Sequence, residues 1–160
     1  MKIYLAGDHA GFRLKSALLE HLPVLGHEVE DLGPLTLDPE DDYPDFVTPL
    51  AHRLANETDA IGIVCAGSGQ GEAMCANRIP GVRATVFYGK TEANAPLDSE
   101  GGHTEDGFDI IRLSRRHNNA NLLSIGARFV SPEVADEAVR IFISTEFDAS
   151  SRHARRLSKF

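Results

Sequence analysis

The sequence contains few cysteines and no long apolar run, and each shortage excludes a class of protein. Its two cysteines, Cys65 and Cys75, are too few for a disulfide framework, and their spacing matches no metal-finger pattern. No segment approaches the roughly 20 apolar residues that a membrane span needs, and the start, MKIYLAGDHAG, lacks the layout of a cleavable signal. We therefore expect a cytoplasmic protein with free thiols and no membrane partner.

Positive charge is also scarce. The chain has 16 Lys and Arg against 24 Asp and Glu, a formal net charge of -8, which argues against nucleic acid as a partner because a phosphate backbone selects for basic surfaces. The deficit is uneven: residues 1–109 carry 7 basic against 19 acidic side chains, and residues 110–160 carry 9 against 5. A local basic cluster suits a small anion, and a solvated helix face is the alternative interpretation.

The 160 residues, 42% of them hydrophobic, suffice for a single domain with a core. Short apolar runs alternate with segments of helical period. We expect strands over residues 2–6, 27–33, 59–67, 82–88 and 121–127, and helices over about 12–22, 46–56, 70–77, 108–116, 132–145 and 150–158. This order predicts an α/β protein: a three-layer Rossmann-like fold with a parallel sheet of about five strands, helices on both faces and a basic C-terminal helix. Residues 89–107 are interpreted as an inserted surface loop or lid.

The stretch CAGSGQGEAMCANR, residues 65–78, joins the third expected strand to a helix. It is not a dinucleotide fingerprint, because its third glycine falls one place early, and it lacks the Gly-Lys-Ser/Thr ending of a P-loop. A phosphatase-type Cys65 would need an arginine where Gly71 stands. What remains is an anion cradle of backbone N–H groups, to which Ser68 adds a hydroxyl donor. Glu72 either faces the bound ligand or simply favours the helix dipole.

Further polar residues cluster around other strand ends. Asp8 and His9 follow the first expected strand, and Arg128 follows the fifth, at the ends where parallel sheets bind ligands. The segment Arg-His-Asn-Asn, residues 116–119, stands just ahead of the fifth strand. An isolated histidine is more often an ordinary surface residue, so it is the pairing of these side chains that favours a site.

The basic tail adds a second type of anion ligand. Arg152 and Arg156 are four residues apart, so they share one face of the expected helix and are able to clamp a phosphate. Arg155 points away from that face and is expected to be solvated. None of these features is specific by itself.

Together they resemble the ribose-5-phosphate isomerase B family, in the wider group that includes galactose-6-phosphate isomerase. The resemblance covers nearly the whole chain through five motifs in order: GDHAGFRLK, DDYPD, GSGQGE with ANRIPGVRA, RRHNNANLLSIGAR and SRHARR. Membership would imply a homodimer, with a tetramer as the alternative, whose active sites are shared between subunits. It would also imply a small phosphorylated sugar as the substrate and no metal or organic cofactor.

One departure from the family pattern concerns the catalytic base. Many members carry a cysteine immediately before the Gly-Thr/Ser-Gly of the loop, a place that Ala66 holds here. Cys65 stands one residue earlier, so it should point to the opposite face of the strand and belong to the core. The other branch, which looks like actinobacterial enzymes, uses the glutamate of GSGxGE, and Glu72 occupies that position.

The remaining roles are likewise implied by the resemblance. Glu72 would shuttle a proton between C1 and C2 through a cis-enediol. Ser68 and the rest of the glycine loop, residues 67–71, would stabilise the enediolate. His117 would open the sugar ring, with Asp8 as the other proton carrier. The expected phosphate ligands are His9, Arg128, Arg152 and Arg156, and the expected ligands of hydroxyls or the enediolate are Asn118 and the amides of Gly67, Gly69 and Gly71. His117, Asn118 and Arg128 are expected to reach in from the partner subunit.

Three functions are open at this point. Isomerisation of ribose 5-phosphate leads, and a six-carbon sugar phosphate, such as allose 6-phosphate or galactose 6-phosphate, is the close alternative substrate, because a lid at residues 89–107 would alter the pocket. A non-catalytic sugar-phosphate-binding module is the third. The presence of Glu72, His117 and Asp8 together speaks against that module.

Overall fold

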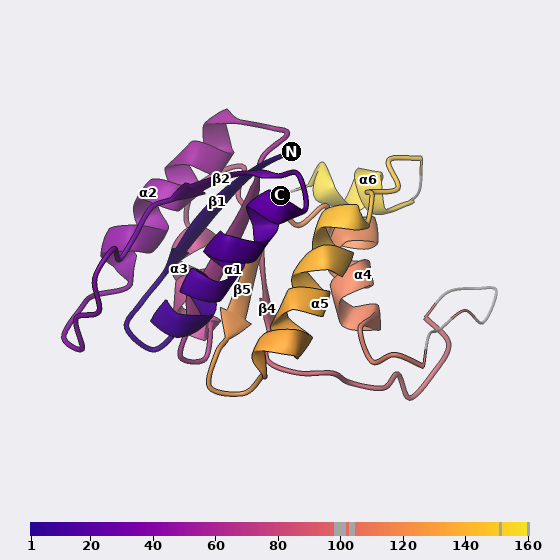
Figure 1. Ribbon diagram of the computed structural model, residues 1–160. Coiled ribbons are helices and arrows are strands. Elements are labelled where there is room, and N and C mark those ends of the chain that lie inside the picture. Colours follow the sequence, from indigo (N-terminus) through magenta and orange to yellow (C-terminus); the bar gives the residue numbers. More distant parts are fainter. Residues whose placement is uncertain (98–101, 103–104, 151, 160) are drawn as a thin grey trace.

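A parallel sheet with helices on both faces forms the protein (Figure 1). The structure is a computed structural model that describes residues 1–97, 102, 105–150 and 152–159. The strands are β1 (Lys2–Gly7), β2 (Glu28–Asp31), β3 (Ile61–Ala66), β4 (Ala84–Phe87) and β5 (Leu122–Gly126), in the order β2-β1-β3-β5-β4. The helices are α1 (Phe12–Val24), α2 (Pro44–Asn56), α3 (Gln70–Ala76), α4 (Asp109–Asn118), α5 (Pro132–Ser144) and α6 (Arg152–Leu157). The predicted α/β Rossmann-like fold is confirmed.

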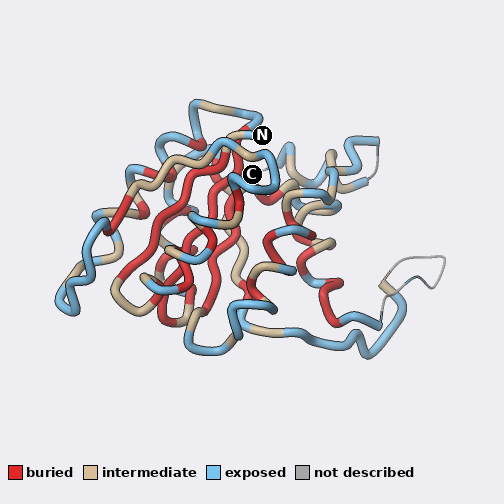
Figure 2. Tube along the Cα trace, viewed as in Figure 1, coloured by how far each residue is buried: buried red, intermediate tan, exposed pale blue. Residues whose placement is uncertain are grey.

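Alternation along the strands builds two cores, one on each face of the sheet. Ile61, Ile63 and Cys65 of β3 face the side that α1, α4 and α5 cover. Val64 and Ala66 face the other side, against α2 and α3. Every residue of β3 is buried, and Figure 2 shows the buried strands in the middle of the molecule. Continuous apolar runs are what a parallel sheet covered on both faces requires.

Chain direction gives the sheet two different edges. All four strand pairs are parallel, so the loops that leave the strands gather at one edge, which we call the carboxyl edge. The helices run back in the opposite direction, so α4 ends at the other edge, the amino edge. Helix α6 packs against α4, and Figure 1 shows it at the end away from the arrowhead of β5.

The segment that was interpreted as an insert, residues 89–107, lies between β4 and α4. Its described residues are 89–97, 102 and 105–107, and these form neither helix nor strand; the rest lie outside the described residues. The backbone N–H of Thr91 donates to the carbonyl of Gly107 at 3.0 Å, which brings the two ends of the segment together. Its role as a lid remains a prediction, as does the single-domain assignment. No helix in the described parts of the chain combines the length and apolar character needed to cross a bilayer.

Candidate active site

The structure divides the predicted site residues between the two edges of the sheet. The carboxyl-edge cluster consists of Asp8, His9, Gly67, Ser68, Gly69, Gly71, Glu72 and Arg128, which follow β1, β3 and β5. The amino-edge cluster consists of His117 and Asn118 at the end of α4 and Arg152 and Arg156 on α6. Since β3 has six residues that rise about 3.3 Å each, the two edges are roughly 20 Å apart.

The glycine loop is held by the end of β5. Gly69 has a φ of 75°, in the left-handed region where glycine has no Cβ penalty, and its carbonyl accepts the Ser124 hydroxyl at 2.7 Å. The backbone N–H groups of Ala127 and Arg128 donate to the carbonyls of Ala66 and Gly67 at 2.7 and 3.2 Å. The loop therefore has a fixed conformation before any ligand arrives.

Glu72 lies in the first turn of α3, and only 5% of it is exposed. Burial raises the pKa of its carboxyl group, and the negative charge of Asp8 raises it further, while a hydrogen bond from its own backbone N–H opposes both. Asp8 is buried too, and its Oδ1 accepts the Gly11 N–H at 2.9 Å. Two buried carboxyl groups, one with a raised pKa, are a typical arrangement for general acid–base chemistry.

His9 is held by a residue that the sequence did not single out. Its Nδ1 lies 2.7 Å from Asp41 Oδ1, and its backbone N–H donates to the same oxygen at 3.1 Å. The hydrogen bond to Asp41 raises the pKa of His9, and the charge of Asp8 adds to it, against burial and the positive charge of Arg128. The side chains of Asp8, His9, Asp41 and Arg128 belong to three different loops. The DDYPD motif was the only sequence signal for Asp41.

Tyr43 also reaches the glycine loop. A Cβ added to Gly71 would lie 2.9 Å from the Tyr43 hydroxyl oxygen, so the ring packs directly against the backbone that precedes Glu72. The DDYPD motif that contains Tyr43 also has the composition of a turn and helix cap. Tyr43 does stand at the N-cap of α2, and Asp45 is in its first turn, so the segment starts a helix and lines the loop.

Arg128 lies beside the loop of its own chain. A Cβ added to Gly67 would be 3.4 Å from the guanidinium carbon of Arg128. The positive charge of Arg128 lowers the pKa of His9, against the larger effect of the hydrogen bond to Asp41 that raises it. The resemblance implied that Arg128 reaches in from a partner. In the structure it joins the carboxyl-edge cluster directly, since it follows β5, which pairs with β3.

In the amino-edge cluster, His117 stacks on a neighbouring histidine, His153, among arginines. The rings of His117 and His153 are parallel within 7°, with centroids 3.8 Å apart. Burial lowers the pKa of His117, and the positive charges of His153, Arg116, Arg152 and Arg156 lower it further. Neutral His117 is therefore favoured near pH 7. His153 is part of the SRHARR motif but had no predicted role, because stacking across α4 and α6 has no signal in the sequence.

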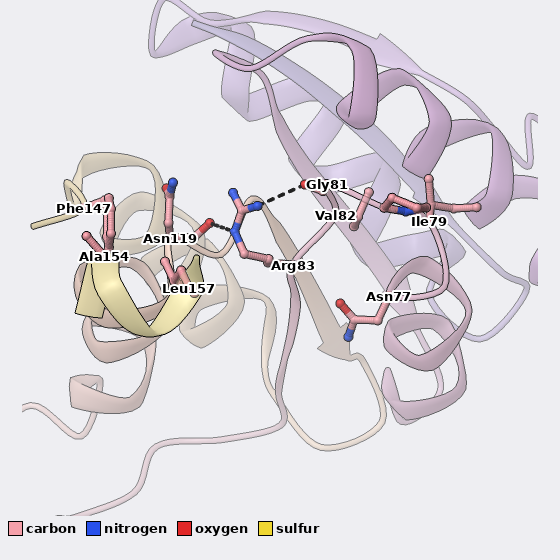
Figure 3. Close-up of a pocket in the computed structure, with 10 residues that line it drawn as sticks. Asn77, Ile79, Gly81, Val82, Arg83, Asn119, Phe147, Ala154 and Leu157 are labelled. Atoms are coloured by element: carbon pink, nitrogen blue, oxygen red, sulfur yellow. Dashed lines mark hydrogen bonds between the residues drawn. The ribbon is translucent and has the colours of Figure 1, made fainter. Parts of the chain in front are cut away.

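A hollow of about 430 Å³ lies next to the amino-edge cluster, between α6 and the segment before β4 (Figure 3). Arg83 crosses it: Nε donates to the Asn119 carbonyl at 2.7 Å, and a terminal nitrogen donates to the Gly81 carbonyl at 3.2 Å. None of the predicted site residues lines this hollow. Among the residues that the structure describes, no three His, Cys, Asp or Glu side chains gather as metal ligands would.

Comparison with known proteins gives a consistent picture. The model of the family described as Ribose/Galactose Isomerase matches residues 3–100 and 108–160, so the internal gap in the match, residues 101–107, falls within the segment interpreted as an insert. The chain is 37% identical to ribose-5-phosphate isomerase B of Mycobacterium tuberculosis over 98% of its length and 86% of that protein.

Solved structures are similar over the same extent. Ribose-5-phosphate isomerase B from Mycoplasma genitalium, with bound ribulose-5-phosphate, is 33% identical with a TM-score of 0.84 and covers 99% of this chain and 92% of its own. The enzyme from Thermotoga maritima is 38% identical with a TM-score of 0.79, covering 99% and 95%.

Proposed function

The chain belongs to the Ribose/Galactose Isomerase family, and we propose that it is an aldose–ketose isomerase that interconverts ribose 5-phosphate and ribulose 5-phosphate. The names of its relatives support this substrate over a six-carbon sugar phosphate. The observation that carries the proposal is the carboxyl-edge cluster, in which a buried Glu72 of raised pKa lies near Asp8 beside a preformed glycine loop.

In the proposed mechanism, Glu72 removes the proton from C2 of the open-chain aldose and delivers it to C1. Burial makes its carboxylate a stronger base than an exposed glutamate. The negative charge that develops on the enediolate is stabilised by the Ser68 hydroxyl and by the amides of the glycine loop, residues 67–71. Because that loop is already fixed, little reorganisation is needed when the charge appears.

Phosphate binding and ring opening need the second cluster. Arg128 and His9 supply positive charge at the carboxyl edge. Arg152 and Arg156 would add a phosphate clamp, and neutral His117 would exchange a proton with the ring oxygen and hydroxyl, but all three lie at the far edge of the same chain. In our proposal a homodimer places the amino-edge cluster of one subunit over the carboxyl-edge cluster of its partner, so each active site is shared.

The proposal is tested by following ketose formation from ribose 5-phosphate in D₂O. Wild type should form ribulose 5-phosphate that carries deuterium at C1 to the extent that the proton held on Glu72 exchanges with solvent before delivery. Glu72→Gln should lose about 10³-fold in kcat. Allose 6-phosphate and galactose 6-phosphate serve as comparison substrates and should turn over more slowly. Faster turnover of a six-carbon sugar would reassign the substrate, and binding of all three without turnover would indicate a sugar-phosphate-binding module.

A further inference from the structure

The carboxylate of Asp41 is buried although it lies on a surface loop between β2 and α2. Its side chain is 5% exposed, whereas that of His9 is 33% exposed. Asp41 Oδ1 accepts two hydrogen bonds from His9, one from ring Nδ1 and one from the backbone N–H. With Nδ1 engaged, Nε2 is the ring nitrogen left for a ligand, and no side chain or backbone group in the described residues forms a hydrogen bond with it.

The other oxygen of Asp41 makes the charge of His9 important. Asp41 Oδ2 is buried and has no hydrogen-bond partner in the described part of the chain. A buried carboxylate is unfavourable unless an opposite charge compensates it, and the His9 imidazole is the one ion-pair partner that the described residues offer. The pair is therefore most stable when His9 is protonated and donates from Nδ1.

The other charges around His9 come from two neighbouring loops. Asp8 precedes it in the loop after β1, and Arg128 follows β5. Asp8 favours the imidazolium and Arg128 disfavours it. Without Asp41, the Asp8 carboxylate and the Arg128 guanidinium would have opposite effects on the protonation of His9. Asp41 therefore decides whether His9 is protonated.

We propose that Asp41 is a positioning residue: it orients His9 and keeps it cationic, so that Nε2–H donates to the phosphate of the sugar. This inference depends on the proposed function for its ligand. It assigns to Asp41 a contribution to substrate affinity, because a charge-assisted hydrogen bond to phosphate is stronger than one from a neutral ring. Proton transfer at C1 and C2 does not involve it.

The loop itself does not depend on the Asp41 carboxylate alone. Near its start, the Gly33 carbonyl accepts the Gly7 N–H at 3.0 Å and the Gly33 N–H donates to Asp31 at 2.9 Å. Close to Asp41, the backbone N–H of Glu40 donates to Asp38 at 3.0 Å. A substitution that keeps the shape of Asp41 and removes its charge should thus leave the loop in place.

The test compares Asp41→Asn with the matched control Asp42→Asn, which removes the same charge from an exposed neighbour whose side chain has no role in the site. Histidine pKa values are measured by NMR titration, with the His9 signal assigned from its loss in His9→Gln. We expect the His9 pKa to fall in Asp41→Asn and to stay unchanged in Asp42→Asn. An unchanged His9 pKa in Asp41→Asn would overturn the proposal, whether or not the protein is an isomerase.

Kinetics supply the second readout. With ribose 5-phosphate at pH 8, Asp41→Asn should raise KM about tenfold and change kcat by less than about twofold. At pH 6 the ratio of KM between variant and wild type should approach one, because acid restores the imidazolium. A KM ratio independent of pH, or a loss confined to kcat, would refute the role. If wild type turns over no sugar, the proposed function fails separately and the NMR titration decides the role of Asp41.

Discussion

A dimer built from two complementary inactive chains should recover activity. One chain carries Glu72→Gln in its carboxyl-edge cluster, and the other carries His117→Ala in its amino-edge cluster. If each active site combines one cluster from each subunit, one site of the heterodimer contains both defects, and the other contains neither. The second site is therefore equivalent to wild type.

The expected magnitude follows from the separation of the clusters. The two edges of the sheet are roughly 20 Å apart, by the rise of about 3.3 Å per residue along β3, so one sugar phosphate cannot touch Glu72 and His117 of the same chain. Each homodimer should then have both sites damaged, Glu72→Gln by about 10³-fold. The heterodimer should retain about one half of the wild-type kcat per dimer.

The assay uses co-expressed chains with two different affinity tags, so that tandem purification yields heterodimers alone. Ketose formation from ribose 5-phosphate is then measured for each preparation. The matched control pairs Glu72→Gln with Asp8→Asn: both changes lie in carboxyl-edge clusters, every site contains one defect, and no recovery is expected. Recovery in the control, or none in the Glu72 and His117 pair despite pure heterodimers, would refute the shared site.

Three further predictions concern single chains. Cys65→Ala should change kcat by less than about twofold and lower the free energy of unfolding, measured in urea, by about 1 kcal/mol. The reason is that the thiol is buried in the core beneath α1 and α5, and burial raises its pKa. A large loss of kcat would make Cys65 the base. Burial also raises the pKa of Glu72, so the fold loses stability as pH rises from the unfolded pKa of Glu72, about 4.3, through its folded pKa. Glu72→Gln should therefore raise Tm at pH 8 by about 2 °C and leave Tm unchanged near pH 4. An equal change in Tm at both pH values would contradict this. Gly11→Ala should cost about 3 kcal/mol or prevent folding, since its Cβ would lie 1.9 Å from the Cys65 carbonyl oxygen; a normal urea midpoint would contradict that packing.

Residue order determined the layers and the identity of the core. Every expected strand and helix is present, with ends that differ by a few residues, because apolar periodicity is a local property that the chain carries wherever it lies. Because successive side chains of a strand point to opposite faces of the sheet, Cys65 lies in one core and Ala66 in the other. The motifs likewise indicated the family that the comparisons then showed.

Tertiary structure decided which of the motif residues meet. Strand order β2-β1-β3-β5-β4 brings Arg128 beside the glycine loop of its own chain, and the return direction of α4 carries His117 to the opposite edge. Asp41 contacts His9 across 32 positions, and no local pattern encodes that pairing. Periodicity fixes the face on which a side chain lies, but distances between loops depend on the order and direction of the strands, which only the folded chain establishes.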